Sequence, residues 1–160
     1  MKKLSTGVNQ TLKLGRCIAA HLKGGEIILL SGQLGTGKTV LAKGIACGLG
    51  IDKNEVVSPT FVLLRVYPGK HLLQHFDFYR IKLAREISYL GYQEYLYSEA
   101  VTVIEWPERL KFLLPKEFLK IKLTLEGKNR RRIEFVAKGA RYRELLKKIH
   151  ESRTFSLFDD

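Results

Sequence analysis

A glycine-rich segment near the start of the chain constrains the fold more than any other feature. Residues 32–39 read Gly-Gln-Leu-Gly-Thr-Gly-Lys-Thr and match the phosphate-binding loop pattern G-x-x-x-x-G-K-[ST]. The apolar run from Ile27 to Leu30 precedes this loop as a predicted buried strand, and residues 38–49 follow it with helical spacing of apolar side chains. The pattern requires this order of strand, loop and helix, so the sequence predicts nucleotide binding.

The residue types of the loop fit the chemistry of a nucleotide phosphate. Gly32, Gly35 and Gly37 let the backbone pass close to an anion without a clashing Cβ. The amide groups of the loop and the N-terminus of the next helix supply partial positive charge. We expect Lys38 to reach the β- and γ-phosphates and the Thr39 hydroxyl to ligate Mg²⁺. No Asn/Thr-Lys-x-Asp motif for guanine is present, which favours ATP as the nucleotide.

Length and composition predict one globular domain in the cytoplasm. The chain has 160 residues, of which 45% are hydrophobic and 28% charged. We assign residues 1–151 to a single domain and residues 152–160 to a polar tail. No apolar run approaches the ~20 residues of a membrane span, and no apolar stretch follows the basic start as in a signal peptide. Cys17 and Cys47 follow no metal or disulfide pattern, which indicates buried thiols in a reducing compartment.

Periodicity along the rest of the chain predicts strands and helices of the α/β class and a C-terminal antiparallel hairpin. Together with the phosphate loop, this favours a phosphate-loop NTPase-like sheet flanked by helices. Gly44 and Gly48 lie one turn apart in the helix after the loop and indicate close packing on the sheet. The other expected elements are a helix at 9–22, a strand pair at 61–67 and 71–76, a mostly helical segment at 82–98, a buried strand at 100–104, a hairpin of 119–125 with 132–137, and a basic helix at 142–151.

Two acidic residues follow apolar strands, where a phosphate-loop hydrolase needs a carboxylate near Mg²⁺ and a group that positions water. The strand before Glu105 is the more continuously apolar, so Glu105 is the predicted Mg²⁺-side carboxylate. Asp77 is the second candidate, as a ligand of metal-bound water or as a water positioner. The alternative for either residue is a strand-end acid that caps a loop.

Nearby polar and aromatic residues complete the predicted site. Thr60, in a Ser-Pro-Thr loop, stands where a switch loop reads the γ-phosphate in hydrolysing relatives of this fold. His75 can carry a proton, although a histidine in a strand is more often structural. Trp106, next to Glu105, either shields the site or only packs.

Four segments together resemble the TsaE (YjeE) family, the small bacterial ATPase of tRNA threonylcarbamoyladenosine synthesis. The segments are Gly32–Thr39, Ser58–Phe61, His75–Arg80 and Ile104–Glu108, in this order. The resemblance covers about residues 5 to 136. It implies an α/β fold with a mixed sheet and a cytoplasmic complex. In that complex a TsaD transferase and its TsaB partner attach threonylcarbamoyl to an adenosine of tRNA.

The resemblance also implies roles for individual residues. Asp77 and Glu105 are expected to be the acidic pair of the active site, and Thr60 a catalytic residue of the switch-like loop. Thr39 and Glu105 are expected to ligate the metal. Nucleotide binding falls to Thr11, Gly32, Gly35, Thr36, Gly37, Lys38, Thr39, Val40 and Trp106, with Thr11 on the adenine side. The family usually has Asp at the position of Gln33 and Ala at that of Thr36. Both positions are variable, so a changed hydrolysis rate or partner contact can follow, while nucleotide binding is retained.

Positive charge gathers at the two ends of the sequence. Residues 1–43 carry a net charge of +6, residues 44–127 of +1 and residues 128–160 of +5. This balance favours a polyanion such as tRNA, approached through the complex, and an unpartnered basic surface is the equal alternative. The expected patch lies at one hairpin turn and on the last helix and comprises Lys128, Arg130, Arg131, Arg132, Arg141, Arg143, Lys147 and Lys148.

Two other functions compete with the ATPase hypothesis. A small-molecule or nucleotide kinase can use the same fold, but no separate arginine-rich lid segment is present. A non-enzymatic RNA-binding module would use the basic ends, but no RNA-recognition signature is present either. Radiolabelled ATP separates the three through free phosphate, a labelled small molecule or neither.

Overall fold

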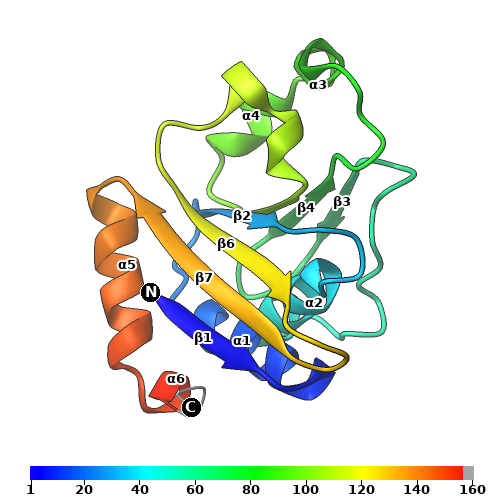
Figure 1. The fold of residues 1–160 in the computed structure, drawn as a ribbon. Coiled ribbons are helices and arrows are strands. Elements are labelled where there is room, and N and C mark those ends of the chain that lie inside the picture. The colour runs from blue at the N-terminus through cyan, green and yellow to red at the C-terminus, as the bar shows by residue number, and fades with distance from the viewer. Residues whose placement is uncertain (157–160) are drawn as a thin grey trace.

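The fold is organised around one mixed sheet. The structure is a computed structural model that describes residues 1–156. The strand order is β1-β7-β6-β2-β5-β4-β3 (Figure 1). The strands are β1 (Lys2–Ser5), β2 (Ile27–Ser31), β3 (Leu64–Tyr67), β4 (Leu73–Asp77), β5 (Val101–Glu105), β6 (Phe118–Leu125) and β7 (Arg131–Lys138). The helices are α1 (Val8–Ala19), α2 (Lys38–Gly48), α3 (Ala84–Tyr89), α4 (Tyr92–Leu96), α5 (Ala140–Glu151) and α6 (Arg153–Ser156), with 3₁₀ turns η1 (Pro107–Arg109) and η2 (Lys111–Leu113).

The four central strands run parallel and the outer strands antiparallel. Strands β6, β2, β5 and β4 are parallel neighbours, whereas β7, β1 and β3 each run antiparallel to their neighbour. Parallel strands end at the same edge of a sheet, so the segments after β2, β4 and β5 meet there. The expected fold class is confirmed, including the β6–β7 hairpin and the β3–β4 pair.

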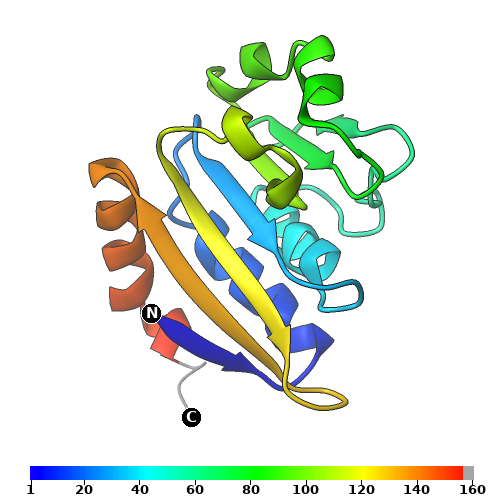
Figure 2. The same cartoon turned by 45° about the horizontal axis from the view of Figure 1, so that its top comes forward.

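The two faces of the sheet are covered to different extents. Helices α1 and α2 lie behind the sheet in Figure 1, and α5 packs along β7. On the opposite face, α3 and α4 lie over the β3–β4 end, where the Tyr92 ring meets Phe76 edge-on. The front of β6 and β7 carries no helix in Figures 1 and 2. Accordingly Lys122 is exposed and Val136 is 56% exposed, while the alternate residue Ile121 is fully buried.

Helices α1 and α2 approach each other closely because glycines face the contact. A Cβ at Gly15 would lie 2.6 Å from the carbonyl oxygen of Leu41. A Cβ at Gly44 would overlap the carbonyl oxygen of Leu12. The expectation that Gly44 and Gly48 pack on the sheet is therefore wrong, since both pack on α1. Their missing side chains let the two backbones touch.

The ends of the described chain hold two elements that the sequence analysis missed. Strand β1 pairs antiparallel with β7 and closes one edge of the sheet. Helix α6 follows Glu151, and its Phe155 is fully buried with its ring 5.6 Å from that of Phe135. The core therefore extends into the segment assigned to a polar tail, whose residues 157–160 lie outside the described part. Within residues 1–156, no helix has the length and apolar character needed to cross a bilayer.

We predict that Gly44→Ala lowers the free energy of unfolding by about 2 kcal/mol, because the new Cβ forces α1 and α2 apart. The direction of the change distinguishes packing from helix propensity, because helix propensity alone would raise the free energy of unfolding by about 1 kcal/mol. Chemical denaturation checks this. Lys43→Ala, a half-buried neighbour on the same helix, should stay within about 0.5 kcal/mol of wild type. A Gly44→Ala protein at least as stable as wild type would contradict the close contact.

Candidate nucleotide-binding site

The loop between β2 and α2 has the backbone shape of an anion cradle. Gly32, Gly35 and Gly37 have φ values of 143°, 79° and 98°, in a region that L side chains rarely adopt. A Cβ at Gly32 would overlap the carbonyl oxygen of Leu123, so only glycine fits there. Thr36 closes the loop by donating its hydroxyl to Gln33 O at 2.9 Å.

Lys38 is held inside this loop by three contacts. Its Nζ donates to the carbonyl oxygens of Gly32 at 2.8 Å and Gln33 at 2.9 Å. The same atom lies 4.0 Å from the centre of the Trp106 ring, within cation–π range. The residue is only 4% exposed. The ammonium is therefore fixed at the point where the loop would receive a phosphate.

The charge state of Lys38 reflects its surroundings. Burial lowers the pKa of the ammonium, and the nearby carboxylates of Glu105, Asp77 and Glu108 act in the opposite direction. An anion in the loop would add to these carboxylates and favour the charged form. The site thus has a cation whose environment is completed by a phosphate.

A chain of hydrogen-bonded polar side chains, of which Glu105 and His75 are buried and Thr39 is half-buried, lies beside Lys38. Thr39 donates its hydroxyl to Glu105 Oε2 at 3.1 Å, and Glu105 Oε1 lies 2.9 Å from His75 Nε2. His75 is fully buried, and its Nδ1 has no partner among the described residues. His75 therefore fixes the orientation of the Glu105 carboxylate.

Asp77 ties the segment after α2 to the end of β4. Its Oδ2 accepts hydrogen bonds from the hydroxyls of Ser58 at 2.8 Å and Thr60 at 2.6 Å. Its Oδ1 accepts one from the backbone amide of Tyr79 at 2.9 Å. Asp77 is only 2% exposed. The predicted switch residue Thr60 is thus hydrogen-bonded to the predicted acid Asp77. Asp77 ends β4, which lies two strands away from β2, the strand that precedes the phosphate loop.

Most of the predicted site residues line one cavity of about 310 Å³. They are Gly35, Gly37, Lys38, Thr39, Val40, Thr60, Asp77, Glu105 and Trp106. Gly32 and Thr36 line a second cavity on the other side of the loop. Thr11 lines neither, because its hydroxyl is buried and lies 2.8 Å from that of Ser5. Its role on the adenine side stays a prediction.

Arg131 belongs to this cavity, although sequence reasoning placed it in a free basic patch. Its Nε donates to the carbonyl oxygen of Thr36 at 3.0 Å, across 95 residues of sequence. Its neighbour Arg132 pairs with Glu126. These two arginines therefore have contacts within the chain, and the role of the turn toward tRNA stays a prediction. No local pattern could reveal the contact, because it depends on how β7 lies beside the loop.

The oxygen donors of the site fit Mg²⁺. The hydroxyl of Thr39 and the carboxylate of Glu105 are hard ligands of the kind that this ion prefers. Within residues 1–156, no group of three or more His, Cys, Asp and Glu could hold a metal ion. Such a sparse donor set suits Mg²⁺, which usually keeps several waters and binds one or two protein groups together with substrate phosphates.

Comparison with known proteins identifies the family. The model for "Threonylcarbamoyl adenosine biosynthesis protein TsaE" matches residues 5–133. The chain belongs to the TsaE family. The resemblance drawn from four motifs is thus confirmed.

Curated TsaE-family relatives and a solved structure agree with this assignment. The tRNA threonylcarbamoyladenosine biosynthesis protein TsaE of Treponema pallidum is 38% identical over 83% of this chain and 98% of its own. The Bacillus subtilis protein of the same name is 36% identical over 93% of both chains. The crystal structure of YdiB from Bacillus subtilis superposes with a TM-score of 0.79 at 32% identity and covers 93% of each chain.

We predict that Arg131→Ala weakens nucleotide binding about tenfold, or about 1.4 kcal/mol, because the loop loses the bond that holds Thr36 O. The matched control is Arg130→Ala, which removes the same charge from an exposed neighbouring residue. Calorimetric titration with ATP and Mg²⁺ measures both variants. Equal losses in the two would show that only net charge matters at this turn.

Proposed function

We propose that this TsaE-family protein is a Mg²⁺-dependent ATPase that supports tRNA threonylcarbamoyladenosine synthesis. ATP hydrolysis drives turnover of a cytoplasmic complex with a TsaD-type transferase and a TsaB-type partner, and tRNA is reached through that complex. The observation that carries the proposed ATPase activity is the hydrogen-bonded chain of Thr39, Glu105 and His75 beside Lys38. Family membership and the names of the relatives support the link to tRNA modification.

Nucleotide binding follows from the geometry of the loop. Its amide groups and the N-terminus of α2 point partial positive charge at the phosphates, and Lys38 exchanges its carbonyl partners for the β- and γ-phosphate oxygens. Thr39 and Glu105 would hold Mg²⁺, which would neutralise charge on the phosphates. His75 keeps the Glu105 carboxylate aimed at this place.

Hydrolysis needs a water in line with the bond to be broken. A water oxygen attacks the γ-phosphorus, the bond from that phosphorus to the bridging oxygen breaks, and ADP, phosphate and a proton leave. Asp77 is the carboxylate that orients this water, because its Oδ2 already accepts hydrogen bonds from two hydroxyls at the edge of the cavity. Thr60 is the hydroxyl that reads the γ-phosphate.

Turnover of the partner complex requires that the nucleotide state reaches the surface. Thr60 is followed by Phe61 and Val62, which are 84% and 55% exposed. The Arg80 guanidinium lies 4.9 Å from the centre of the Phe61 ring. When Thr60 exchanges Asp77 for a γ-phosphate, this apolar tip moves with it. Phe61 and Val62 are thus the exposed residues through which ATP hydrolysis changes the contact with a partner protein.

Lys38→Ala should lower ATP affinity about 100-fold or more, about 2.7 kcal/mol, because it removes the charged donor of the loop. Thr39→Ala should bind ATP with an affinity that no longer depends on Mg²⁺. Titrations with and without Mg²⁺ test both, and Lys43→Ala on the same helix serves as a control with wild-type affinity. Unchanged affinity in Lys38→Ala would refute nucleotide binding by this loop.

Glu105→Gln and Asp77→Asn should keep ATP binding but lower the rate of phosphate release about 100-fold, because metal and water placement supply most of the rate. Glu55→Gln, an exposed acid, should retain wild-type turnover. ATP labelled at the γ-phosphate also separates the kinase alternative, since a kinase moves the label to a small molecule. Wild-type turnover in both site variants would remove the roles given to these acids.

A further inference from the structure

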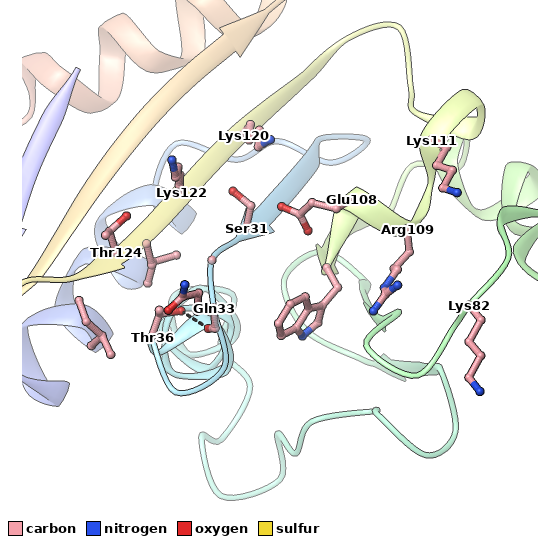
Figure 3. A pocket seen from close by; sticks show the side chains of 14 residues that line it. Ser31, Gln33, Thr36, Lys82, Glu108, Arg109, Lys111, Lys120, Lys122 and Thr124 are labelled. Atoms are coloured by element: carbon pink, nitrogen blue, oxygen red, sulfur yellow. Dashed lines mark hydrogen bonds between the residues drawn. The ribbon is translucent and has the colours of Figure 1, made fainter.

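A second cavity, of about 750 Å³, adjoins the phosphate loop from the opposite face of the sheet. Ser31 of β2 and Lys122 of β6 are register partners on this uncovered face. Leu30, one residue earlier, pairs with Glu105 on the side of the nucleotide-binding cavity, because successive residues of a strand face opposite sides of the sheet. Turn η1 forms the far rim (Figure 3). Trp106 lines both cavities. We call the second one the basic cavity.

The charge around the basic cavity is strongly one-sided. One carboxylate, that of Glu108, lines it. The five cations that line it are Lys82, Arg109, Lys111, Lys120 and Lys122. None of the five forms an ion pair with another described residue. Like charges gathered around one hollow repel each other, so an anionic ligand would be stabilised there.

We propose that the basic cavity binds a single-stranded RNA segment through its phosphates. This site goes beyond the proposed ATPase function, since RNA can bind here whether or not ATP is hydrolysed. Its cations are also different from those of the expected hairpin patch, where Arg131 and Arg132 already contact Thr36 and Glu126.

The spacing of the cations suits an extended phosphodiester chain. Lys120 and Lys122 lie two residues apart on one face of β6, roughly 7 Å along the strand. Successive phosphates of a nucleic-acid strand have a comparable separation. Arg109 and Lys111 stand across the hollow on η1 and η2, as Figure 3 shows. A backbone that runs between the two rows meets cations on both sides.

Two polar groups between these rows favour RNA over other polyanions. Ser31 is 3% exposed, and its hydroxyl has no hydrogen-bond partner among the described residues. It lies with Glu108 in the middle of the view in Figure 3. Glu108 is exposed there, and a carboxylate only accepts hydrogen bonds, so it favours a ligand that carries donors beside its phosphates. The 2′-hydroxyl of RNA is such a donor, whereas DNA lacks it and an acidic peptide brings further carboxylates.

The test compares two double variants that lose the same charge. Lys120→Gln/Lys122→Gln removes two cations of the basic cavity, and Lys53→Gln/Lys70→Gln removes two exposed lysines outside it. The probe is a fluorescein-labelled 12-nucleotide oligouridylate, measured by anisotropy over a salt series. We expect the first variant to lose at least tenfold in affinity at low salt. Its log–log salt slope should fall by about 1.4, or about 0.7 for each lost phosphate contact.

A second comparison tests the choice of RNA. In the wild type, oligouridylate should bind more tightly than the matching oligodeoxyuridylate. Glu108→Ala should strengthen DNA binding and reduce that preference, because it removes both the repulsion and the acceptor for the 2′-hydroxyl. If poly-glutamate competes better than RNA at equal charge, the occupant is an acidic peptide and the RNA proposal is wrong.

ATP titration of each variant separates this proposal from the ATPase function. Intact ATP binding in Lys120→Gln/Lys122→Gln shows that the protein is folded and that any lost RNA affinity belongs to the basic cavity. Should that variant misfold, Arg109→Gln/Lys111→Gln on the opposite rim replaces it. Equal RNA affinity and equal salt slopes in the rim variant and in Lys53→Gln/Lys70→Gln overturn the proposal.

Discussion

The buried ammonium of Lys38 is the group on which the order of the site depends. Removing an ammonium from water costs several kcal/mol unless other groups compensate. Here the compensation comes from two loop carbonyls, the face of Trp106 and the carboxylates of Glu105 and Asp77. These groups lie after or at the ends of β2, β5 and β4. These groups can surround one ammonium because the three parallel strands β2, β5 and β4 end at the same edge of the sheet.

The position of the loop also depends on how deeply α2 sits. Lys38 and Thr39 form its first turn, so any shift of the helix moves both. The glycine contact with α1 sets that depth, because Gly15 and Gly44 bring the two backbones together without intervening side chains. A packing feature one to two turns along the helix thus determines where the Thr39 hydroxyl lies. Close-packed interiors transmit such shifts because they have few voids to absorb them.

Local patterns were sufficient to predict the phosphate loop, the α/β class and the β6–β7 hairpin, since each depends on a few neighbouring residues. They could not give the contact of Arg131 with Thr36 or that of His75 with Glu105, because each joins strands or loops far apart in sequence. Strand β1 escaped prediction for another reason. Its four residues are too short for a clear alternation, and pairing with β7 alone makes them a strand.

The sheet separates two sites that the phosphate loop joins. Thr39 and Glu105 lie on the nucleotide side, Ser31 and the lysines of β6 on the other, and Trp106 borders both. Trp106 has a φ of 60°, a costly conformation for a residue other than glycine, and this conformation sets its ring against Lys38. Trp106 therefore lines the basic cavity and also contacts the Lys38 ammonium of the phosphate loop. If the two ligands influence each other, the coupling is reciprocal by thermodynamic necessity, and Trp106 with the loop is the shortest connection between them.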